Sequence, residues 1–157
     1  MRKTTLCYIF RGDEVLLLHR TRKQNDPNHD KWIGVGGGIE RGETPEQGLL
    51  REVREETGYT LTRFRARGLI HFLSDSAPNE LMYLYTADEF SGEPIPCDEG
   101  ELQWVPRERI PDLPTWEGDR IFLRLILNDA PWFELLLRYE GETLTDATLD
   151  GAPISIL

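Results

Sequence analysis

The sequence predicts one domain of the α/β or α+β class, in which a mixed β-sheet packs with two helices. Its 157 residues suit one ordinary domain that closes its own core. Strand-like apolar runs occur in both halves of the chain, and two segments carry helix signals. No internal repeat, low-complexity tract or linker interrupts this pattern. A single domain over residues 1–157 is therefore expected.

The N-terminal quarter predicts a hairpin followed by a loop. Residues 4–10 and 14–19 are apolar runs, and Arg11-Gly12-Asp13 between them suits a tight turn. The polar segment 21–31 contains Asn25-Asp26-Pro27-Asn28, so it is predicted as a loop. Residues 32–38 contain four glycines, which is too many to predict a regular element.

A helix is predicted to begin after Thr44. Thr44 can serve as the N-cap, Pro45 suits the first helical position, and Gln47 completes a capping box. Gly58 lies where this helix should end, because glycine readily adopts the left-handed conformation of a helix C-terminus.

The remaining elements follow from apolar periodicity. Strands are predicted over residues 64–73, 81–87 and 102–105. A second helix is predicted over residues 119–127, because Ile121, Phe122, Leu125 and Ile126 would share one face. A closing hairpin is expected over residues 133–139 and 144–149, around Glu140-Gly141-Glu142.

The composition restricts the class of partner. The net charge of −10 argues against binding to polymeric nucleic acid, which needs clustered cations. It allows a small phosphorylated substrate in a metal-loaded acidic pocket, and a solvated acidic surface explains it almost as well. No apolar run approaches the ~20 residues that a membrane helix needs. Two cysteines, Cys7 and Cys97, form no disulfide framework and suit the reducing cytoplasm.

The predicted helix after Thr44 carries a group of carboxylates. Helical periodicity places Glu52 and Glu56 on one face, with Glu55 beside them, at the border of the apolar stripe. Like charges at this spacing oppose helix formation by a few tenths of a kcal/mol per pair, so something should compensate. Arg51, four residues before Glu55, can compensate one of them.

The remaining negative charge suits hard divalent cations such as Mg²⁺, which prefer carboxylate, carbonyl and water oxygens. A backbone carbonyl of Gly36 or Gly37 could join the metal shell, because glycine lets the backbone approach closely. The alternative is a solvated acidic helix face with Arg51 and Arg54 as its ion-pair partners.

The spacing of these residues forms a longer pattern. From Gly37 to Tyr59 the chain reads G-x5-E-x7-R-E-U-x-E-E-x-G-U, where U is apolar. A chance match is on the order of one in 10⁹ per start site at ordinary residue frequencies. The pattern resembles the Nudix box, with Tyr59 at a position that is usually aliphatic. The resemblance implies an α/β/α sandwich with a mixed sheet between helices. It also implies hydrolysis of a nucleoside diphosphate linked to another group, with Mg²⁺ or Mn²⁺.

By motif position, Glu52, Glu55 and Glu56 are expected to bind metal or activate water, and Glu43 and Arg51 to brace the loop and helix. Which carboxylate accepts the water proton varies across the family. Glu99 aligns with a further metal-binding glutamate outside the box, and Asp98 and Glu101 are alternatives. The Gly36 carbonyl is the backbone candidate for the same metal shell.

The run from residue 31 to 37 and the C-terminal half resemble the MutT-like subgroup, which includes 8-oxo-dGTP diphosphatases. The resemblance implies that Asp119 hydrogen-bonds the base edge. Trp116 and Phe72 would supply apolar faces, although large aromatic residues are also typical of a core. Ile33 stands where the animal enzyme has an asparagine, so base recognition is expected to differ. The other expected pocket residues are Thr5, Arg20 and Met82.

The resulting expectation is a nucleoside triphosphate pyrophosphohydrolase that removes oxidised purine nucleotides such as 8-oxo-dGTP, releasing a nucleoside monophosphate and pyrophosphate. The alternatives are a Nudix hydrolase of ADP-ribose or of a dinucleoside polyphosphate, and a Nudix-fold binding module without catalysis. The expected partner is a small nucleotide, with no polymeric nucleic acid and no membrane. The chain could be a monomer or a homodimer.

Overall fold

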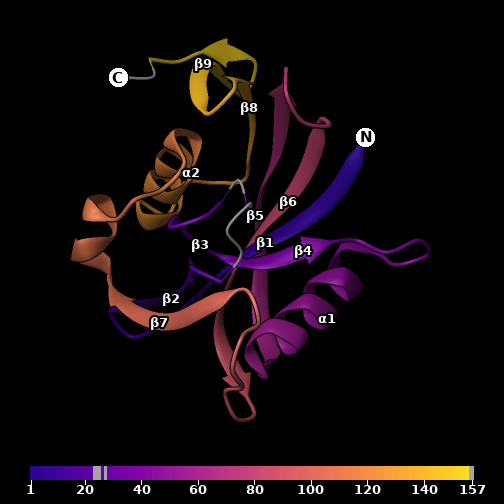
Figure 1. The fold of residues 1–157 in the computed structure, drawn as a ribbon, viewed down its shortest axis with the longest axis vertical. Helices are drawn as coiled ribbons and strands as arrows, with labels where there is room; N and C mark the ends of the chain where they lie inside the picture. Colours follow the sequence, from indigo (N-terminus) through magenta and orange to yellow (C-terminus); the bar gives the residue numbers. More distant parts are fainter. Residues whose placement is uncertain (23–25, 27, 156–157) are drawn as a thin grey trace.

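A computed structural model describes residues 1–22, 26 and 28–155. Its strands form one ten-stranded sheet with a helix on each side (Figure 1). The strands are β1 (Arg2–Arg11), β2 (Glu14–Arg20), β3 (Trp32–Ile33), β4 (Val35–Gly38), β5 (Thr60–Ser74), β6 (Glu80–Ser91), β7 (Gly100–Pro106), β8 (Phe133–Glu140), β9 (Thr143–Leu149) and β10 (Ala152–Pro153). The helices are α1 (Pro45–Thr57) and α2 (Glu117–Leu127), with a short 3₁₀ helix over Arg107–Asp112.

The sheet is mixed, as predicted. Its strand order is β10-β9-β8-β5-β6-β1-β2-β3, with β4 added beside β1 and β7 beside β2. The pairs β1–β6 and β5–β8 are parallel, and the other pairs are antiparallel. Parallel neighbours need a crossover connection, and the long connections that carry α1 and α2 provide it.

The two helices cover opposite faces of the sheet, and alternate side chains of β1 pack toward one helix or the other. Cys7 and Ile9 pack in the core cluster that contains Leu49 and Val53 of α1. Leu6 and Tyr8 pack in the cluster that contains Phe122 and Ile126 of α2. This alternation is the two-residue period of an extended strand buried on both faces. The expected α/β/α sandwich is therefore confirmed.

Both ends of α1 agree with the sequence prediction. The Thr44 hydroxyl accepts a hydrogen bond from the Gln47 backbone N–H at 3.1 Å, and the Gln47 side chain accepts one from the Thr44 N–H at 2.9 Å. At the other end, Gly58 adopts a left-handed conformation with φ of 82° and donates its N–H to the Arg54 carbonyl. A capping side chain of this kind contributes about 1 kcal/mol to helix stability.

The prediction that residues 32–38 form no regular element is wrong. Gly36 pairs with Leu6 of β1, and a Cβ at position 36 would collide with the carbonyl oxygen of Thr5. A Cβ on Gly34 would likewise lie 2.8 Å from the Cys7 carbonyl oxygen. The glycines therefore allow β4 to approach β1 closely, and they do not mark an irregular segment.

Other boundaries moved by a few residues. The strand predicted over residues 64–73 begins at Thr60, and the 3₁₀ helix and β10 were not predicted. The predicted turns at residues 11–13 and 140–142 are confirmed by the Arg11–Glu14 and Glu140–Thr143 pairs. Of the loop predicted over 21–31, residues 23–25 and 27 lie outside the described part. Neither helix in the described chain is long and apolar enough to cross a membrane.

Candidate active site

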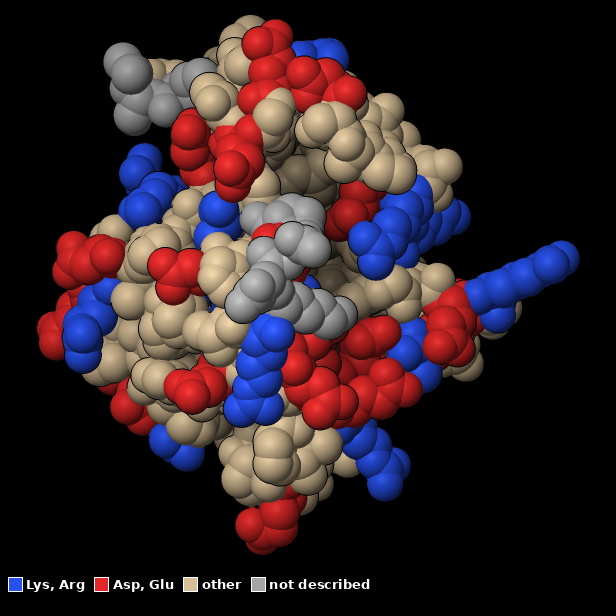
Figure 2. Space-filling view, in the orientation of Figure 1, with Lys and Arg blue, Asp and Glu red and all other residues tan. Residues whose placement is uncertain are grey.

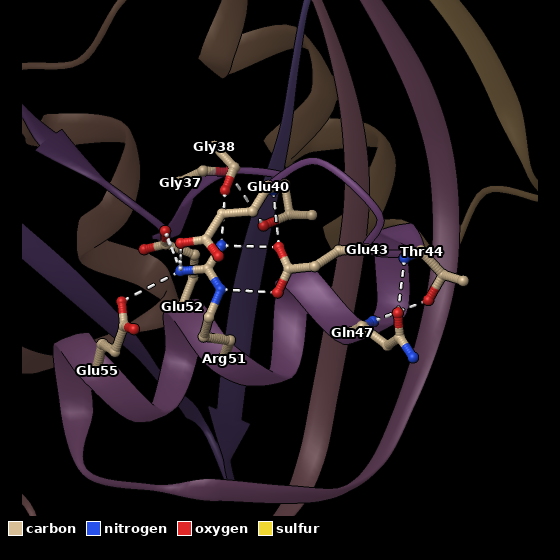
Figure 3. A network of polar contacts seen from close by, with 10 residues as sticks. Gly37, Gly38, Glu40, Glu43, Thr44, Gln47, Arg51, Glu52 and Glu55 are labelled. Atoms are coloured by element: carbon tan, nitrogen blue, oxygen red, sulfur yellow. Dashed lines mark hydrogen bonds and ion pairs between the residues drawn. The ribbon is translucent and has the colours of Figure 1, made fainter.

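Arg51 on α1 is the centre of a polar network at the end of β4 (Figure 3). Its guanidinium donates two hydrogen bonds to the Glu43 carboxylate, at 2.8 and 3.0 Å, and one to the Gly38 carbonyl at 2.9 Å. It also donates to Glu52 at 2.9 Å and to Glu55 at 3.2 Å. One side chain thus ties the loop after β4 to two carboxylates of the helix.

The charges within this network stabilise one another. The hydrogen bond from Arg51 lowers the pKa of the Glu43 carboxyl, and the bond from the Glu40 backbone N–H lowers it further by a smaller amount. The bonds to Glu43 in turn raise the pKa of the Arg51 guanidinium. A bidentate hydrogen bond between arginine and carboxylate fixes the relative orientation of the two groups as well as pairing their charges. The loop is therefore held in one geometry against α1.

Gly37 makes room for the Glu52 carboxylate. A Cβ at position 37 would lie 2.5 Å from the carboxyl carbon of Glu52, so any side chain there would displace the Glu52 carboxylate from its place. The Glu52 side chain is 17% exposed, whereas that of Glu55 is 59% exposed. Glu52 is therefore enclosed between the helix and the glycine strand, and Glu55 lies at the surface of the same group.

Glu56 is the carboxyl of α1 whose pKa is shifted most from its ordinary value. Its Oε2 accepts a hydrogen bond from the Gly36 N–H at 3.1 Å. Burial raises the pKa of Glu56 to about 8, against the effect of that N–H, and the negative charges of Glu99 and Glu52 raise it further. The Arg20 charge acts in the opposite direction. A partly buried carboxyl among other carboxyls is a group that a bound cation would stabilise in its ionised form.

Arg20 of β2 bridges two carboxylates that lie outside α1. It donates to Asp26 through Nε at 2.7 Å and to Glu99 through Nη1 at 2.7 Å. The structure thereby places Glu99 close enough to Glu56 for its charge to act on Glu56. Asp98 and Glu101, the two alternatives to Glu99, are both exposed. Arg20 therefore lies among the acidic side chains around Glu56, away from the aromatic side chains described below.

The donor set of this region fits Mg²⁺. The candidate ligands are the carboxylates of Glu52, Glu55, Glu56 and Glu99, together with the Gly36 carbonyl, and all of them are hard oxygen donors. Acidic side chains gather over α1 on the face shown in Figure 2. Within the described residues, no three acidic, histidine or cysteine side chains converge as a ready-made cage. Mg²⁺ does not need one, because it keeps several waters and takes few protein ligands.

The raised pKa of Glu56 predicts a pH dependence of stability. A carboxyl whose pKa is about 8 when folded, against an ordinary 4.5, contributes stability that is fully present below pH 4.5. That contribution is lost as the pH rises toward 8, because the unfolded chain releases this proton from about pH 4.5 whereas the folded protein keeps it up to about pH 8. Saturating Mg²⁺ should offset the loss, since a metal binds the ionised carboxyl. We expect the Tm of the metal-free protein to fall between about pH 5 and pH 8.

Thermal unfolding with a chelator and with Mg²⁺ measures this effect, and Glu56→Gln is the matched variant. Asp119 has a pKa raised to about 7 and contributes in the same direction, but it is present in both proteins. The difference between the two Tm profiles therefore isolates Glu56. Parallel profiles for wild type and Glu56→Gln would contradict the assignment.

A second group of side chains lies on the α2 face of the sheet. The Trp116 indole N–H donates to the Asn28 side chain at 2.6 Å, and the Lys31 ammonium lies 4.5 Å from the centre of the Trp116 ring. Tyr139 meets Trp116 edge-on at 5.6 Å and stacks with Phe72 at 6.4 Å. Met82 is buried in the core cluster against which Phe72 and Trp116 pack.

Asp119 lies in the first turn of α2 and is only 6% exposed. Burial raises its pKa to about 7, and the charge of Lys31 partly opposes that shift. No described group donates a hydrogen bond to its carboxyl, although its backbone N–H donates to the Trp116 carbonyl at 3.1 Å. A buried acid without a donor has hydrogen-bonding capacity left for a ligand.

Two of the expected pocket residues lie apart from Trp116 and Asp119. The Thr5 hydroxyl donates to the Gly37 carbonyl at 3.5 Å, on the face of β1 that packs with α1. Arg20 hydrogen-bonds Asp26 and Glu99, as described above, and acts on Glu56 through its charge. Ile33 lies in β3, opposite Leu18, directly after a tryptophan that packs with the α2 cluster.

Several residues of these groups were not found from the sequence. Asp26 pairs with Arg20, Asn28 and Lys31 contact Trp116, and Tyr139 connects Trp116 to Phe72. Asp26 lies only six residues from Arg20, but it belongs to no recognisable motif. The partners around Trp116 come from distant parts of the chain and meet only in the folded protein, so no local signal could have identified them.

Comparisons with known proteins agree with this fold. A family model for the NUDIX domain matches residues 1–126. The chain is 30% identical over 151 residues to an uncharacterized Nudix hydrolase, YvcI, of Bacillus subtilis, covering 87% of this chain and 92% of that protein. It is 32% identical over 139 residues to an oxidized purine nucleoside triphosphate hydrolase of Mus musculus, covering 87% and 80%. The crystal structure of a mutator MutT protein from Bacillus halodurans superposes with a TM-score of 0.86, at 26% identity, and covers 98% of this chain and all of that one.

Proposed function

Because the chain belongs to the Nudix hydrolase family, we propose that it hydrolyses nucleoside triphosphates to a nucleoside monophosphate and pyrophosphate, with oxidised purine deoxynucleotides such as 8-oxo-dGTP preferred. The observation that carries this proposal is the group of carboxyls around Glu56. Its partly buried carboxyl, with a pKa of about 8, lies within reach of the charges of Glu52 and Glu99. Such a group suits a divalent cation and the phosphate chain that the cation binds.

The residues that would hold Mg²⁺ or Mn²⁺ are Glu52, Glu55, Glu56 and Glu99, with the Gly36 carbonyl. When bound, the ion supplies Lewis-acid activation of water and neutralises negative charge on the phosphates. Arg51 keeps Glu52 and Glu55 in place through its hydrogen bonds and fixes the loop that ends at Glu43. This fixed arrangement spares the site from reorganising as negative charge develops on the phosphoryl oxygens.

Glu56 and Glu55 are the two candidates to accept the proton of the attacking water. The Glu56 carboxyl accepts the Gly36 N–H through Oε2 at 3.1 Å, and its other oxygen accepts no hydrogen bond from a described group. Glu55 is more exposed and already accepts a hydrogen bond from Arg51 at 3.2 Å. We assign the proton to Glu56, because its carboxyl is enclosed in the site and has an oxygen free to accept it.

The group on the α2 face supports a purine substrate. Trp116 and Phe72 offer apolar ring faces, Met82 lies in the cluster against which they pack, and Asp119 offers a carboxyl with unused hydrogen-bonding capacity. Ile33 adds an apolar side chain beside Trp32. The mouse relative named as an oxidized purine nucleoside triphosphate hydrolase is similar over most of its length, which favours the same substrate class.

Two further features fit this proposal. The sheet runs from Arg2 to Pro153, which supports treating residues 1–157 as one domain, with the Nudix box at 37–59. Cys7 and Cys97 are both buried free thiols, which supports a reducing compartment such as the cytoplasm.

A nucleotide panel tests the substrate class. With saturating Mg²⁺, we expect kcat/KM for 8-oxo-dGTP to exceed that for dGTP, dATP, ADP-ribose and a dinucleoside polyphosphate. The products should be the nucleoside monophosphate and pyrophosphate. Equal or faster turnover of ADP-ribose or the dinucleoside polyphosphate would overturn the substrate assignment and would leave the family assignment intact.

A further inference from the structure

A cavity with several cationic side chains lies between the start of β1 and the loop that follows β4. It has a volume of about 500 Å³ and is lined by residues 1–3 and 38–43. The Ile39 backbone N–H donates to the Lys3 carbonyl at 2.9 Å, so a hydrogen bond joins the two walls. None of the candidate metal ligands and none of the expected base-contacting residues lines this cavity.

The cavity has three side-chain cations, from Arg2, Lys3 and Arg41. Arg2 pairs with Glu80 at 3.5 Å, and its Nη2 lies 3.7 Å from the place that a Cβ on Gly38 would take. Lys3 and Arg41 are exposed, and no described acidic side chain pairs with either of them. Two of the three cations are therefore free to bind an anion.

The two acidic side chains of the cavity lining are already paired. Both Glu43 oxygens accept hydrogen bonds from the Arg51 guanidinium, at 2.8 and 3.0 Å (Figure 3). Glu40 lies 3.6 Å from the same guanidinium. An anion that enters the cavity would thus meet the unpaired positive charges of Lys3 and Arg41, although the whole chain has a net charge of −10.

The cavity lies beside the proposed metal site. The carbonyl of Gly38, a lining residue, accepts a hydrogen bond from Arg51 at 2.9 Å, and the same guanidinium donates to Glu52 at 2.9 Å. Gly36, the backbone candidate for the metal shell, comes two residues earlier on β4, which is about 7 Å along an extended strand. A phosphate chain held by a metal ion at Gly36 and Glu52 can therefore extend along β4 into the cavity.

We propose that this cavity binds the two terminal phosphates of a nucleoside triphosphate, the part that is released as pyrophosphate. The inference rests on the proposed nucleotide hydrolase function. Lys3 and Arg41 bind these phosphates through charge-assisted hydrogen bonds, and Arg2 adds a third positive charge. ADP-ribose ends in a sugar and has no terminal phosphate to place there. The cavity therefore favours triphosphates over nucleoside diphosphates that are linked to a sugar.

The double variant Lys3→Gln/Arg41→Gln tests this role, because it removes both unpaired cations. We expect the Kd for pyrophosphate, measured by titration calorimetry with Mg²⁺ present, to rise about tenfold as two charged contacts are lost. The kcat/KM for dGTP should fall by a similar factor. The Kd for dGMP, which lacks the terminal phosphates, and the Mg²⁺ concentration for half-maximal rate should change less than about twofold. The Tm should not change, because no described acidic side chain pairs with either cation.

Arg109→Gln/Arg124→Gln is the matched control. It removes the same amount of charge from two exposed arginines, one in the 3₁₀ helix and one in α2, that do not line the cavity. Its Kd for pyrophosphate should stay within about twofold of wild type, because salt screens charges that do not touch the ligand. An equal loss of pyrophosphate binding in both double variants would overturn the proposal, as would an unchanged Kd in Lys3→Gln/Arg41→Gln.

The two measurements separate this inference from the proposed function. If wild type binds pyrophosphate through Lys3 and Arg41 but hydrolyses no triphosphate, the proposed function fails and the cavity still binds pyrophosphate. If triphosphate hydrolysis occurs and Lys3→Gln/Arg41→Gln binds pyrophosphate as tightly as wild type, only the role of the cavity fails.

Discussion

Replacing Glu56 with glutamine is expected to reduce kcat by about 10³-fold or more, with the fold intact. Glutamine keeps the shape and can still accept the Gly36 N–H, which bonds Glu56 at 3.1 Å in the wild type. It cannot ionise, so both the proposed metal ligand and the proton acceptor are lost. A positioned general base alone contributes about 10² to 10⁴ in rate. Steady-state kinetics with 8-oxo-dGTP and saturating Mg²⁺ give kcat, and thermal unfolding reports the fold.

Glu46→Gln is the matched control, because Glu46 is an exposed glutamate in the first turn of the same helix. Its kcat should stay within about twofold of wild type, as is usual for surface substitutions away from a site. The stability of Glu56→Gln should equal or exceed that of the wild type at neutral pH, because a buried ionisable group is removed. A Glu56→Gln variant with near-normal kcat would exclude Glu56 from the mechanism.

The second large effect is expected for Arg51→Lys. Lysine keeps the positive charge but loses the planar fork that donates to Glu43, Gly38 and Glu52 together. We expect kcat to fall about 10²-fold, because misplaced carboxylates no longer hold the reacting groups in line. The free energy of unfolding should fall by about 2 kcal/mol, the scale of a lost hydrogen bond to a charged group. Kinetics and chemical denaturation measure the two effects.

Arg54→Lys provides the comparison on the same helix. Arg54 is exposed, and no described acidic side chain forms an ion pair with it. Both its kcat and its unfolding free energy should stay close to wild type. If Arg51→Lys behaves like Arg54→Lys, the network in Figure 3 has no part in organising the carboxylates.

The elements with local signals could be predicted from the sequence. The capping box at Thr44 and the glycine at position 58 determine both ends of α1, because their hydrogen bonds connect residues at most four positions apart. The spacing of Glu52, Glu55 and Glu56 on that helix follows from its periodicity alone. The family motif then identified the fold class, which strand patterns by themselves left open between α/β and α+β.

The rest depends on contacts between distant segments. The glycine-rich segment becomes β4 only because β1 lies beside it and leaves no room for a Cβ at Gly36. The ion pair between Arg20 and Glu99 joins residues 79 positions apart. The shifted pKa values of Glu56 and Asp119 come from burial, which requires the complete packing of the sheet and helices. No composition or short-range pattern contains this information.

The most direct test of the account is phosphorus NMR of dGTP or 8-oxo-dGTP incubated with the purified protein and Mg²⁺. The carboxyls around Glu56 are proposed to hold the ion and to promote attack of water on the phosphate chain. The triphosphate signals should therefore be replaced by those of the nucleoside monophosphate and pyrophosphate. A chelator should stop the conversion, and added Mg²⁺ should restore it. An unchanged triphosphate spectrum with both Mg²⁺ and Mn²⁺ would contradict the account.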